Sequence, residues 1–341
     1  MDENSGRNIL ITGGTGFLGG YVKTALESSG LICADLKNGH EIVDIRDALR
    51  IKSFLEGLGY IPDAVMHLAA QSFVPRSFEN PLETFGVNFT GTYNLLNALK
   101  ETGFKGLFVY ISSGDIYGLI GENELPVAEE HPLRPRNPYA VSKTAAEALC
   151  FQWSVTENIK IISARPFNNI GPGQSENFAV PSFAKQITEI KLGLKEPVIY
   201  VGDIDATRDF LDVRDAAEAY ALLIKNGIRG LGRQNKQSLE NYNFSAYNIS
   251  SGKETSLRHI INIMLEISGV KAEIKTDESR LRANEQKRIC GSNEKIKKDC
   301  GWNPKITLRE SIGNILKYYE EKLKTEGDAI LCQRQMSKRA L

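Results

Sequence analysis

The chain has 341 residues, of which 41% are hydrophobic and 25% are charged, as is typical of a globular protein. Lys plus Arg and Asp plus Glu number 42 each, so no overall positive charge points to nucleic acid or an anionic membrane as partner. No apolar run approaches the roughly 20 residues that a membrane helix needs, and the polar N-terminus lacks a secretory pattern. Five widely spaced cysteines without a zinc-binding pattern predict free thiols in the cytoplasm and no metal site.

The first half of the chain alternates short apolar runs with amphipathic patterns. The predicted strands are residues 8–12, 31–36, 63–70, 106–113 and 159–168. The predicted helices are residues 17–30, 47–59, 82–102 and 137–158. This regular alternation predicts a parallel sheet with helices on both faces. His67, near the end of the third strand, is expected to pack there rather than to act as a catalyst.

The composition changes after Asn168. Residues 168–183 are rich in Gly, Pro and Asn and predict a loop, of the kind that binds ligands at the carboxyl ends of strands in α/β proteins. The polar stretch 227–243 predicts an exposed loop, and residues 325–341 predict a poorly ordered tail.

Amphipathic patterns predict three helices in this second half, at residues 209–226, 256–269 and 307–324. Asp212, Arg214 and Asp215 lie near the start of the first of them. We expect these three residues to begin the helix and to carry surface charge, not to form a site.

Three glycines, Gly13, Gly16 and Gly19, directly follow the first predicted strand in ILITGGTGFLGG. Glycines let the chain turn tightly and approach a pyrophosphate, which then meets the positive end of the next helix. Because the triplet lies between a strand and a helix in the first unit of the sheet, it predicts a bound dinucleotide. Asp35 ends the second strand and can accept hydrogen bonds from the adenosine ribose, which favours NADH. Lys37 lies close enough in sequence to help hold a 2′-phosphate, so the choice between NADH and NADPH stays open.

Tyr139 and Lys143 in NPYAVSK are four residues apart and share one face of a predicted helix. A nearby ammonium favours the phenolate and is expected to lower the pKa of the tyrosine. Such a tyrosine can exchange a proton with an alcohol or a ketone near neutral pH. An exposed helix pair is the alternative, because this spacing is common by chance. The preceding glycine triplet and the serine-rich strand end favour catalysis.

Five motifs together resemble the extended short-chain dehydrogenase/reductases that act on nucleotide sugars, and the resemblance extends to about residue 323. They are TGGTGFLG (12–19), HLAAQ (67–71), ISSGDIYG (111–118), NPYAVSK (137–143) and ARPFNNIGPGQ (164–174). The resemblance implies a catalytic triad of Ser113, Tyr139 and Lys143, in which Ser113 holds the substrate oxygen, with Ser112 near the nicotinamide. It also implies a homodimer that pairs through the helices holding residues 82–102 and 138–157.

Further residues are expected around the cofactor. Asp44, in EIVDIRD, either binds the adenine or caps the next helix. The remaining expected cofactor contacts are Thr15, Phe17, Leu18, Ile45, Leu68, Ala69 and Ala70.

Positions 114 and 115 bear on the type of reaction. Members of the resembled family that dehydrate sugars usually carry Asp and Glu here, and the glutamate removes a proton from C5 of the sugar. Gly114 offers no acid, and Asp115 is one methylene shorter than glutamate. Dehydration is therefore disfavoured, whereas this stretch alone leaves an epimerase and a reductase open.

The substrate loops are similar to those of the family's GDP-4-keto-6-deoxy-D-mannose reductases. The similar stretches are ARPFNNIGPGQSENFAVPSFAKQI, KEPVIYVGDIDATRDFLDVRD and SRLRANEQ. This resemblance implies a GDP-sugar substrate, reduced at C4 by NADPH or NADH to give GDP-D-rhamnose. The residues that it implies in substrate binding are Ser113, Asp115, Asn168, Val180, Lys185, Arg208, Arg282 and Glu285. The chain departs from the pattern at Asn169, where histidine is usual, and in a longer 227–243 loop.

The resulting expectation is an α/β protein with a Rossmann-type doubly wound parallel sheet and a smaller C-terminal α/β substrate lobe. Residues 1–170, with 209–250 returning to them, would bind NAD(P). Residues 171–208 and 251–323 would bind the nucleotide sugar, and residues 324–341 would form the tail.

Two other enzymatic readings stay open. One is a nucleotide-sugar C4 epimerase with tightly bound NAD, and the other is the C4-epimeric reductase that gives GDP-6-deoxy-D-talose. A nicotinamide-sensing binding protein of the same fold is a further alternative, but such a protein would not need the triad.

Overall fold

The computed structural model describes residues 6–230, 243–281 and 286–339. Its centre is a parallel sheet of six strands in the order β11-β7-β6-β5-β1-β2. These strands are β1 (Asn8–Thr12), β2 (Ile32–Asp35), β5 (Ala64–His67), β6 (Leu107–Ile111), β7 (Lys160–Pro166) and β11 (Phe244–Ile249). The chain runs from β1 out to β2 and then returns to the other side of β1, which creates a switch point between β1 and β5. The predicted doubly wound parallel sheet is confirmed.

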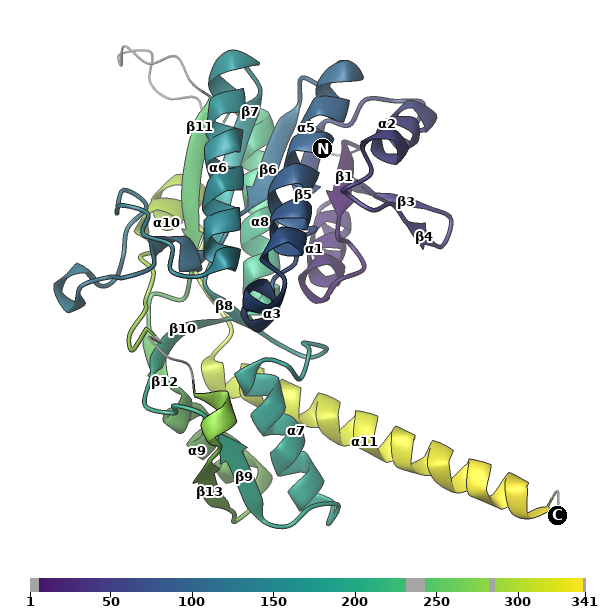
Figure 1. The fold of residues 1–341 in the computed structure, drawn as a ribbon, viewed down its shortest axis with the longest axis vertical. Coiled ribbons are helices and arrows are strands. Elements are labelled where there is room, and N and C mark those ends of the chain that lie inside the picture. The colour runs from purple at the N-terminus through teal and green to yellow at the C-terminus, as the bar shows by residue number, and fades with distance from the viewer. Residues whose placement is uncertain (1–5, 231–242, 282–285, 340–341) are drawn as a thin grey trace.

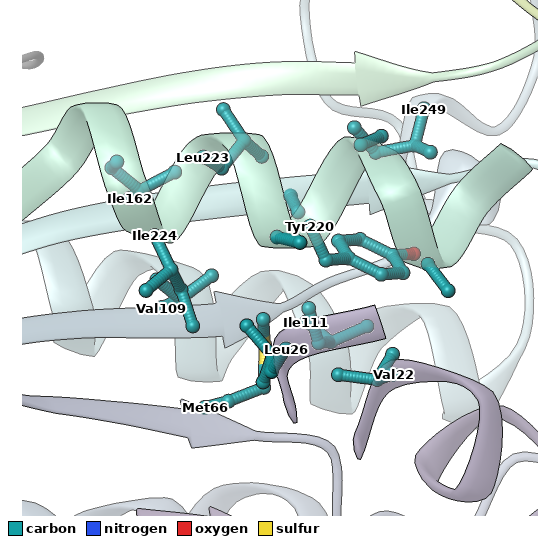
Figure 2. Packing of buried hydrophobic residues seen from close by; sticks show 14 of the residues in the cluster. Val22, Leu26, Met66, Val109, Ile111, Ile162, Tyr220, Leu223, Ile224 and Ile249 are labelled. Atoms are coloured by element: carbon teal, nitrogen blue, oxygen red, sulfur yellow. The ribbon is translucent and has the colours of Figure 1, made fainter. Parts of the chain in front are cut away.

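Helices cover both faces of this sheet (Figure 1). One face carries α1 (Phe17–Ser28) and α8 (Val213–Arg229), and the other carries α2 (Ala48–Gly57), α5 (Gly91–Glu101) and α6 (Pro138–Thr156). Successive residues of β1 point to opposite faces, so Ile9 and Ile11 join the core under α1 and α8 while Leu10 joins the other core. Figure 2 shows Val22 and Leu26 of α1 and Tyr220 and Leu223 of α8 packed over the strands. Burial on both faces explains why these strands read as continuous apolar runs.

The helical region predicted for residues 82–102 is confirmed, but it is not uniform. It begins as α4 (Pro81–Phe85), widens into the π-helical segment η1 (Gly86–Thr90) and continues as α5. A short helix that the sequence reading missed, α3 (Val74–Glu79), precedes it. A hairpin of β3 (Lys37–Asn38) and β4 (Glu41–Ile42) follows β2.

A second set of elements lies beyond the carboxyl ends of the central strands (Figure 1). It contains a sheet of β8 (Asn168–Ile170), β10 (Thr207–Asp212) and β12 (Glu254–Ser256), and the pair β9 (Val198–Val201) and β13 (Glu273–Thr276). Its helices are α7 (Ala179–Lys191), α9 (Leu257–Ser268) and α11 (Leu308–Arg339). A separate core rich in isoleucine joins these helices. The remaining elements are α10 (Glu294–Cys300) and the 3-10 turns η2 (Gly114–Tyr117), η3 (Glu122–Glu124) and η4 (Glu278–Arg280).

Two predicted boundaries in this region were wrong. The loop predicted for residues 168–183 contains strand β8, which pairs in parallel with β10, and its last part already belongs to α7. The helix predicted from residue 209 begins only at Val213, because residues 207–212 pair as β10 with two other strands. Both errors arise because short strands are set by distant pairing partners and not by local pattern.

The acidic residues at the start of α8 are buried, although we expected surface charge. Asp212 does cap the helix, accepting a hydrogen bond from the Arg214 amide, and it also accepts one from the Ser311 hydroxyl. Asp215 accepts hydrogen bonds from the amides of Lys305 and Ile306. These bonds tie the start of α11 to α8 and supply the partners that a buried carboxylate needs.

The C-terminal end of the chain also differs from the prediction. Helix α11 continues to Arg339, where we expected a poorly ordered tail from residue 325. The stretch is rich in helix-forming residues and contains no proline, which explains its helical backbone. In Figure 1, α11 projects away from the rest of the molecule. The predicted 227–243 loop falls largely outside the described residues, and its first residues close α8.

His67 is buried at the end of β5, as expected for a packed residue. Its ring nitrogens lie 2.7 Å from the Thr12 hydroxyl and 2.9 Å from the Thr92 hydroxyl. Burial, together with the positive charge of Lys143, lowers the pKa of His67 from 6.5 to about 3. The ring therefore stays neutral in the folded protein under conditions in which it takes up a proton in the unfolded chain.

This difference predicts an acid sensitivity that His67→Gln removes. Between pH 6.5 and 4.5 the unfolded state binds a proton that the folded state excludes. The free energy of unfolding therefore decreases as the pH is lowered, by about 1.4 kcal/mol per pH unit at most. Above pH 6.5 the His67 ring is neutral in both the folded and the unfolded state, so it does not make the free energy of unfolding depend on pH. We expect urea unfolding to show that, between pH 6.5 and 4.5, the wild type loses about 2 kcal/mol more of its free energy of unfolding than His67→Gln does. Substitution of the exposed His259 by glutamine provides the control and should leave the pH dependence of the wild type in place. If His67→Gln also kept that pH dependence, the assignment to His67 would be wrong.

Candidate active site

A large cleft runs along the carboxyl ends of the central strands and reaches the second set of elements. Its volume is about 2280 Å³, against roughly 300–1,000 Å³ for a typical small-molecule pocket. The cleft therefore has room for two ligands placed end to end. The predicted site residues that line it are Gly13, Thr15, Gly16, Phe17, Leu18, Gly19, Asp44, Ile45, Leu68, Ala69, Ala70, Ser112, Ser113, Asp115, Tyr139, Lys143, Asn168, Val180 and Arg208.

Two other predicted residues, Asp35 and Lys185, are not among the described residues that line the cleft. Asp35 lies behind Gly14, and Lys185 lies beside the carboxylate of Glu176, with its Nζ 2.5 Å from Oε2. Arg282 and Glu285 fall outside the described residues. The roles predicted for these four remain predictions.

The glycine loop after β1 forms a cradle at one end of the cleft. Gly13 has a φ of 75°, and a Cβ there would lie 2.8 Å from the Ala69 amide nitrogen. A Cβ at Gly19 would lie 2.1 Å from the Gly13 carbonyl oxygen. Gly16 precedes α1, and no described side chain caps this helix start. A helix N-terminus with free amides beside close-approaching backbone fits a pyrophosphate.

Asp35 supplies a second feature that fits a dinucleotide. Its Oδ1 is buried and has no hydrogen-bond partner among the described residues. A Cβ at Gly14 would lie 1.9 Å from this oxygen, so the carboxylate presses directly against the glycine loop. The other oxygen, Oδ2, lies 3.4 Å from the Lys23 ammonium and 3.9 Å from that of Lys37. One acceptor is thus directed toward the loop while the lysines neutralise the other.

The predicted triad gathers where β6 ends and α6 begins. Asn137 caps α6 by accepting a hydrogen bond of 2.7 Å from the Ala140 amide, which places Tyr139 in the first turn and Lys143 one turn later. Ser113 caps the turn η2, and its side chain hydrogen-bonds to Tyr139. The Lys143 ammonium donates a 2.6 Å hydrogen bond to the Ile111 carbonyl oxygen.

The expected lowering of the Tyr139 pKa is not found. Burial raises this pKa, the hydrogen bond with Ser113 lowers it in part, and the negative charge of Asp115 raises it further. Burial also lowers the pKa of Lys143 to about 7, because the protein interior disfavours its charged form. The desolvation of both groups outweighs the ammonium effect that the helical spacing suggested. Tyr139 is therefore a protonated phenol at neutral pH, which suits a proton donor.

A buried ionic network holds α6 in place behind the triad. Arg165 of β7 donates a 3.0 Å hydrogen bond from Nε to Glu147 of α6, and its other nitrogens bond Glu147, the Tyr117 hydroxyl and the Glu129 carbonyl oxygen. Ser163 donates a further 2.8 Å bond to Glu147. Both charged side chains are more than nine-tenths buried. The helix that carries Tyr139 and Lys143 is thereby fixed against the central sheet.

The structure adds residues that the sequence reading did not assign to the site. Phe73, Phe167, Arg280 and Gln286 also line the cleft. Phe167 stands inside the ARPFNN motif and Arg280 inside SRLR, so both were within quoted stretches but carried no predicted role. Phe73 carried no sequence signal. Its ring packs against that of Phe178, with ring centroids 6.0 Å apart.

A protein-family model described as GDP-mannose 4,6 dehydratase matches residues 35–315. The chain belongs to this family. A GDP-6-deoxy-D-mannose reductase from Pseudomonas aeruginosa is 42% identical over 320 residues, which is 94% of this chain and 99% of the relative. The membership confirms the resemblance to extended short-chain dehydrogenase/reductases.

Two further comparisons place the chain within the family. The structure of RMD from Pseudomonas aeruginosa complexed with NADPH matches with a TM-score of 0.82 at 40% identity, covering 93% of this chain and 99% of that one. A GDP-6-deoxy-D-talose 4-dehydrogenase from Aggregatibacter actinomycetemcomitans is 30% identical over 289 residues, or 84% of this chain and 89% of the relative.

Within residues 6–230, 243–281 and 286–339, no group of three or more His, Cys, Asp and Glu side chains is arranged to hold a metal ion. None of the helices in the same ranges has the length and apolarity needed to cross a membrane.

Proposed function

We propose that this protein reduces the C4 ketone of GDP-4-keto-6-deoxy-D-mannose with NADPH or NADH and forms GDP-D-rhamnose. The observation that carries this proposal is the meeting of Ser113, Tyr139 and Lys143 in the same cleft as the glycine cradle. The similarity to a GDP-6-deoxy-D-mannose reductase supports the choice of substrate.

The cofactor, when bound, supplies the hydride. The hydroxyls of Ser113 and Tyr139 bind the C4 carbonyl oxygen and hold it still. As negative charge develops on that oxygen, Tyr139 gives it a proton, and Lys143 stabilises the phenolate that remains. Because Tyr139 is protonated at neutral pH, it is ready to act as the acid in a reduction. Preorganised donors aimed at a developing oxyanion account for much of the rate gain in such sites.

The far end of the cleft is proposed to hold the nucleotide. Arg208 and Asn168 line the cleft, and a guanidinium can bind two phosphate oxygens at once. Lys185, Arg282 and Glu285 stay proposed contacts of the diphosphate and the nucleotide ribose. We also propose that residues 1–170 with 209–250 bind the dinucleotide, and that 171–208 with 251–323 bind the nucleotide sugar. Val180 at the start of α7 would then contact the substrate, together with Asp115.

One assay tests the proposed function and its alternatives. The protein is mixed with GDP-4-keto-6-deoxy-D-mannose, generated in situ by a dehydratase, and oxidation of NADH and of NADPH is followed separately. We expect stoichiometric oxidation and a product that NMR identifies as GDP-D-rhamnose. GDP-6-deoxy-D-talose as product would assign the C4-epimeric reductase. Interconversion of nucleotide hexoses without net oxidation of added cofactor would assign an epimerase and overturn the proposal.

The choice between the two cofactors is expected to depend on Asp35. Its carboxylate would repel a 2′-phosphate placed near its buried Oδ1, whereas it can accept a hydrogen bond from a ribose hydroxyl. We expect Asp35→Ser to raise the ratio of kcat/KM for NADPH to that for NADH by about tenfold, which is about 1.4 kcal/mol. Lys37→Met should shift the same ratio in the opposite direction. An unchanged ratio in Asp35→Ser would remove Asp35 from cofactor selection.

The homodimer remains a proposal. The helices through which we expect it to form carry exposed apolar side chains, among them Leu82 (83% exposed), Val141 and Val155. A cytoplasmic location likewise stays a prediction from the cysteine pattern.

A further inference from the structure

Phe167 occupies the space beside Gly114, the residue that directly follows Ser113. A Cβ built on Gly114 would lie 3.1 Å from two carbons of the Phe167 ring, which is tighter than about nine in ten real Cβ contacts. On another side of the ring, a Cβ at Gly291 would lie only 2.3 Å from Phe167 Cε2. A side chain at position 291 would therefore overlap the ring, and one at position 114 would have to displace it by a few tenths of an ångström.

The surroundings also fix the ring in its position. Phe167 stacks on Tyr117, with centroids 6.3 Å apart and an interplanar angle of 25°. The Tyr117 hydroxyl donates a 2.6 Å hydrogen bond to Asn248 and accepts one of 2.8 Å from Arg165. The Phe167 amide donates a 3.0 Å hydrogen bond to the Ile249 carbonyl oxygen. These contacts hold the ring in place beside Gly114.

Gly291, which lies against another side of the Phe167 ring, is also held in place. Gly291 donates a 3.3 Å hydrogen bond from its amide to Oδ2 of the buried Asp209. Asp209 also accepts hydrogen bonds of 2.7 Å and 3.0 Å from the amides of Ser251 and Gly252. One carboxylate thus joins β10 to two separate chain segments and keeps Gly291 against the Phe167 ring.

Phe167 and Ile289 together form an apolar wall of the cleft. Both are buried in one small hydrophobic cluster, and both line the cleft with Ser113, Gly114 and Tyr139. Neither side chain carries a hydrogen-bonding atom. The wall therefore suits an alkyl group and leaves a hydroxyl placed against it without a partner.

Simple connectivity places such a group here. Ser113 and Tyr139 would hold the oxygen on C4 of the sugar, so the carbons bonded to C4 must lie beside these residues. One neighbour, C3, bears a hydroxyl, and the other, C5, bears C6, which is a methyl group in a 6-deoxy sugar. Only the C5 side matches an apolar wall next to Ser113.

We propose that Phe167, uncovered by the absence of a side chain at Gly114 and backed by Ile289, recognises the C6 methyl group and selects 6-deoxy sugars. This inference deepens the proposed function and rests on it for the placement of C4. It names a specificity-determining residue, because Phe167 contacts the substrate without taking part in proton or hydride transfer.

The test uses binding without turnover. GDP-D-rhamnose and GDP-D-mannose differ only by the C6 hydroxyl, and calorimetry without cofactor gives a dissociation constant for each, with GDP as reference. We expect the wild type to bind GDP-D-rhamnose about tenfold more tightly than GDP-D-mannose. Equal dissociation constants would overturn the proposal, whatever the variants do.

Two variants locate the discrimination. Phe167→Ala should reduce the tenfold ratio to below about threefold by opening the wall to water. Gly114→Ser, which brings a Cβ and a hydroxyl against the Phe167 ring and requires a shift of a few tenths of an ångström there, should reduce the ratio in the same direction. In both variants the dissociation constant of GDP should change little. A ratio that stays tenfold in the folded Phe167→Ala protein, or in Gly114→Ser if the first does not fold, would overturn the assignment.

The control is Phe104→Ala, which removes a buried ring that does not line the cleft. It should keep the wild-type ratio even though it loosens the core. Failure of the proposed function would appear separately, as absence of cofactor oxidation with the keto sugar, because the binding ratio requires no reaction.

Discussion

Replacing Tyr139 with phenylalanine should lower kcat for ketone reduction by about 10²–10⁴-fold. The change removes only the hydroxyl, and with it the proton donor and one of the two groups that bind the carbonyl oxygen. The ring stays in a buried position in the first turn of α6, so the fold should be retained. Steady-state kinetics with saturating cofactor and keto sugar measure the loss.

Two matched measurements separate this chemical role from a structural one. Cofactor binding to Tyr139→Phe, followed by fluorescence titration, should change less than threefold. Tyr247→Phe removes the hydroxyl of another buried tyrosine, one that does not line the cleft and bonds to Asp299, and should retain near-normal kcat. If Tyr139→Phe kept nearly full turnover, Tyr139 would not be the proton donor.

Replacing Arg165 with methionine should reduce the free energy of unfolding by about 3–5 kcal/mol. Methionine fills much of the same space but leaves the Glu147 carboxylate buried without its cationic partner, with Ser163 as a remaining donor. Burying an unpaired charge costs far more than the pair itself contributes. Urea unfolding followed by circular dichroism measures the change.

The double variant Arg165→Met with Glu147→Leu provides the decisive comparison. It removes both charges, so we expect it to recover most of the lost stability. As a surface control, Arg258→Met breaks the exposed pair with Asp205, which should leave the free energy of unfolding nearly unchanged. A double variant as unstable as Arg165→Met alone would show that lost packing, not the unpaired carboxylate, causes the effect.

Arg165→Met and Tyr139→Phe affect the same helix, α6, in different ways: the first weakens its attachment to the sheet, and the second removes a reactive group from it. Arg165 and Glu147 hold α6 against β7, and α6 presents Tyr139 and Lys143 to the cleft. We therefore expect Arg165→Met to lose activity only in proportion to unfolding, whereas Tyr139→Phe loses activity in a folded protein.

Local sequence determined the frame of this protein. The alternation of apolar strands and amphipathic helices predicted the parallel sheet, because burial on both faces demands continuous apolar strands. The glycine triplet after β1 predicted the cradle, since only residues without a Cβ can approach Ala69 and pack α1 so closely. The four-residue spacing of Tyr139 and Lys143 placed them on one face of a helix, as the structure has them.

Only the tertiary structure decided what depends on distant residues. Strands β8 and β10 pair with each other across the chain, so no local pattern marked them. The burial of Asp212 and Asp215 follows from the docking of α11, which nothing near α8 in sequence reveals.

The protonation states of the site also depend on folding. The spacing of Tyr139 and Lys143 suggested a lowered tyrosine pKa, but the depth of the cleft raises it, because desolvation disfavours the phenolate more than nearby groups favour it. The apolar wall has the same origin: Gly114, Phe167 and Gly291 lie far apart in sequence, and only the fold brings them together. Local sequence thus predicted which residues are reactive. Packing among distant segments determined their protonation states and the shape of the cleft that they face.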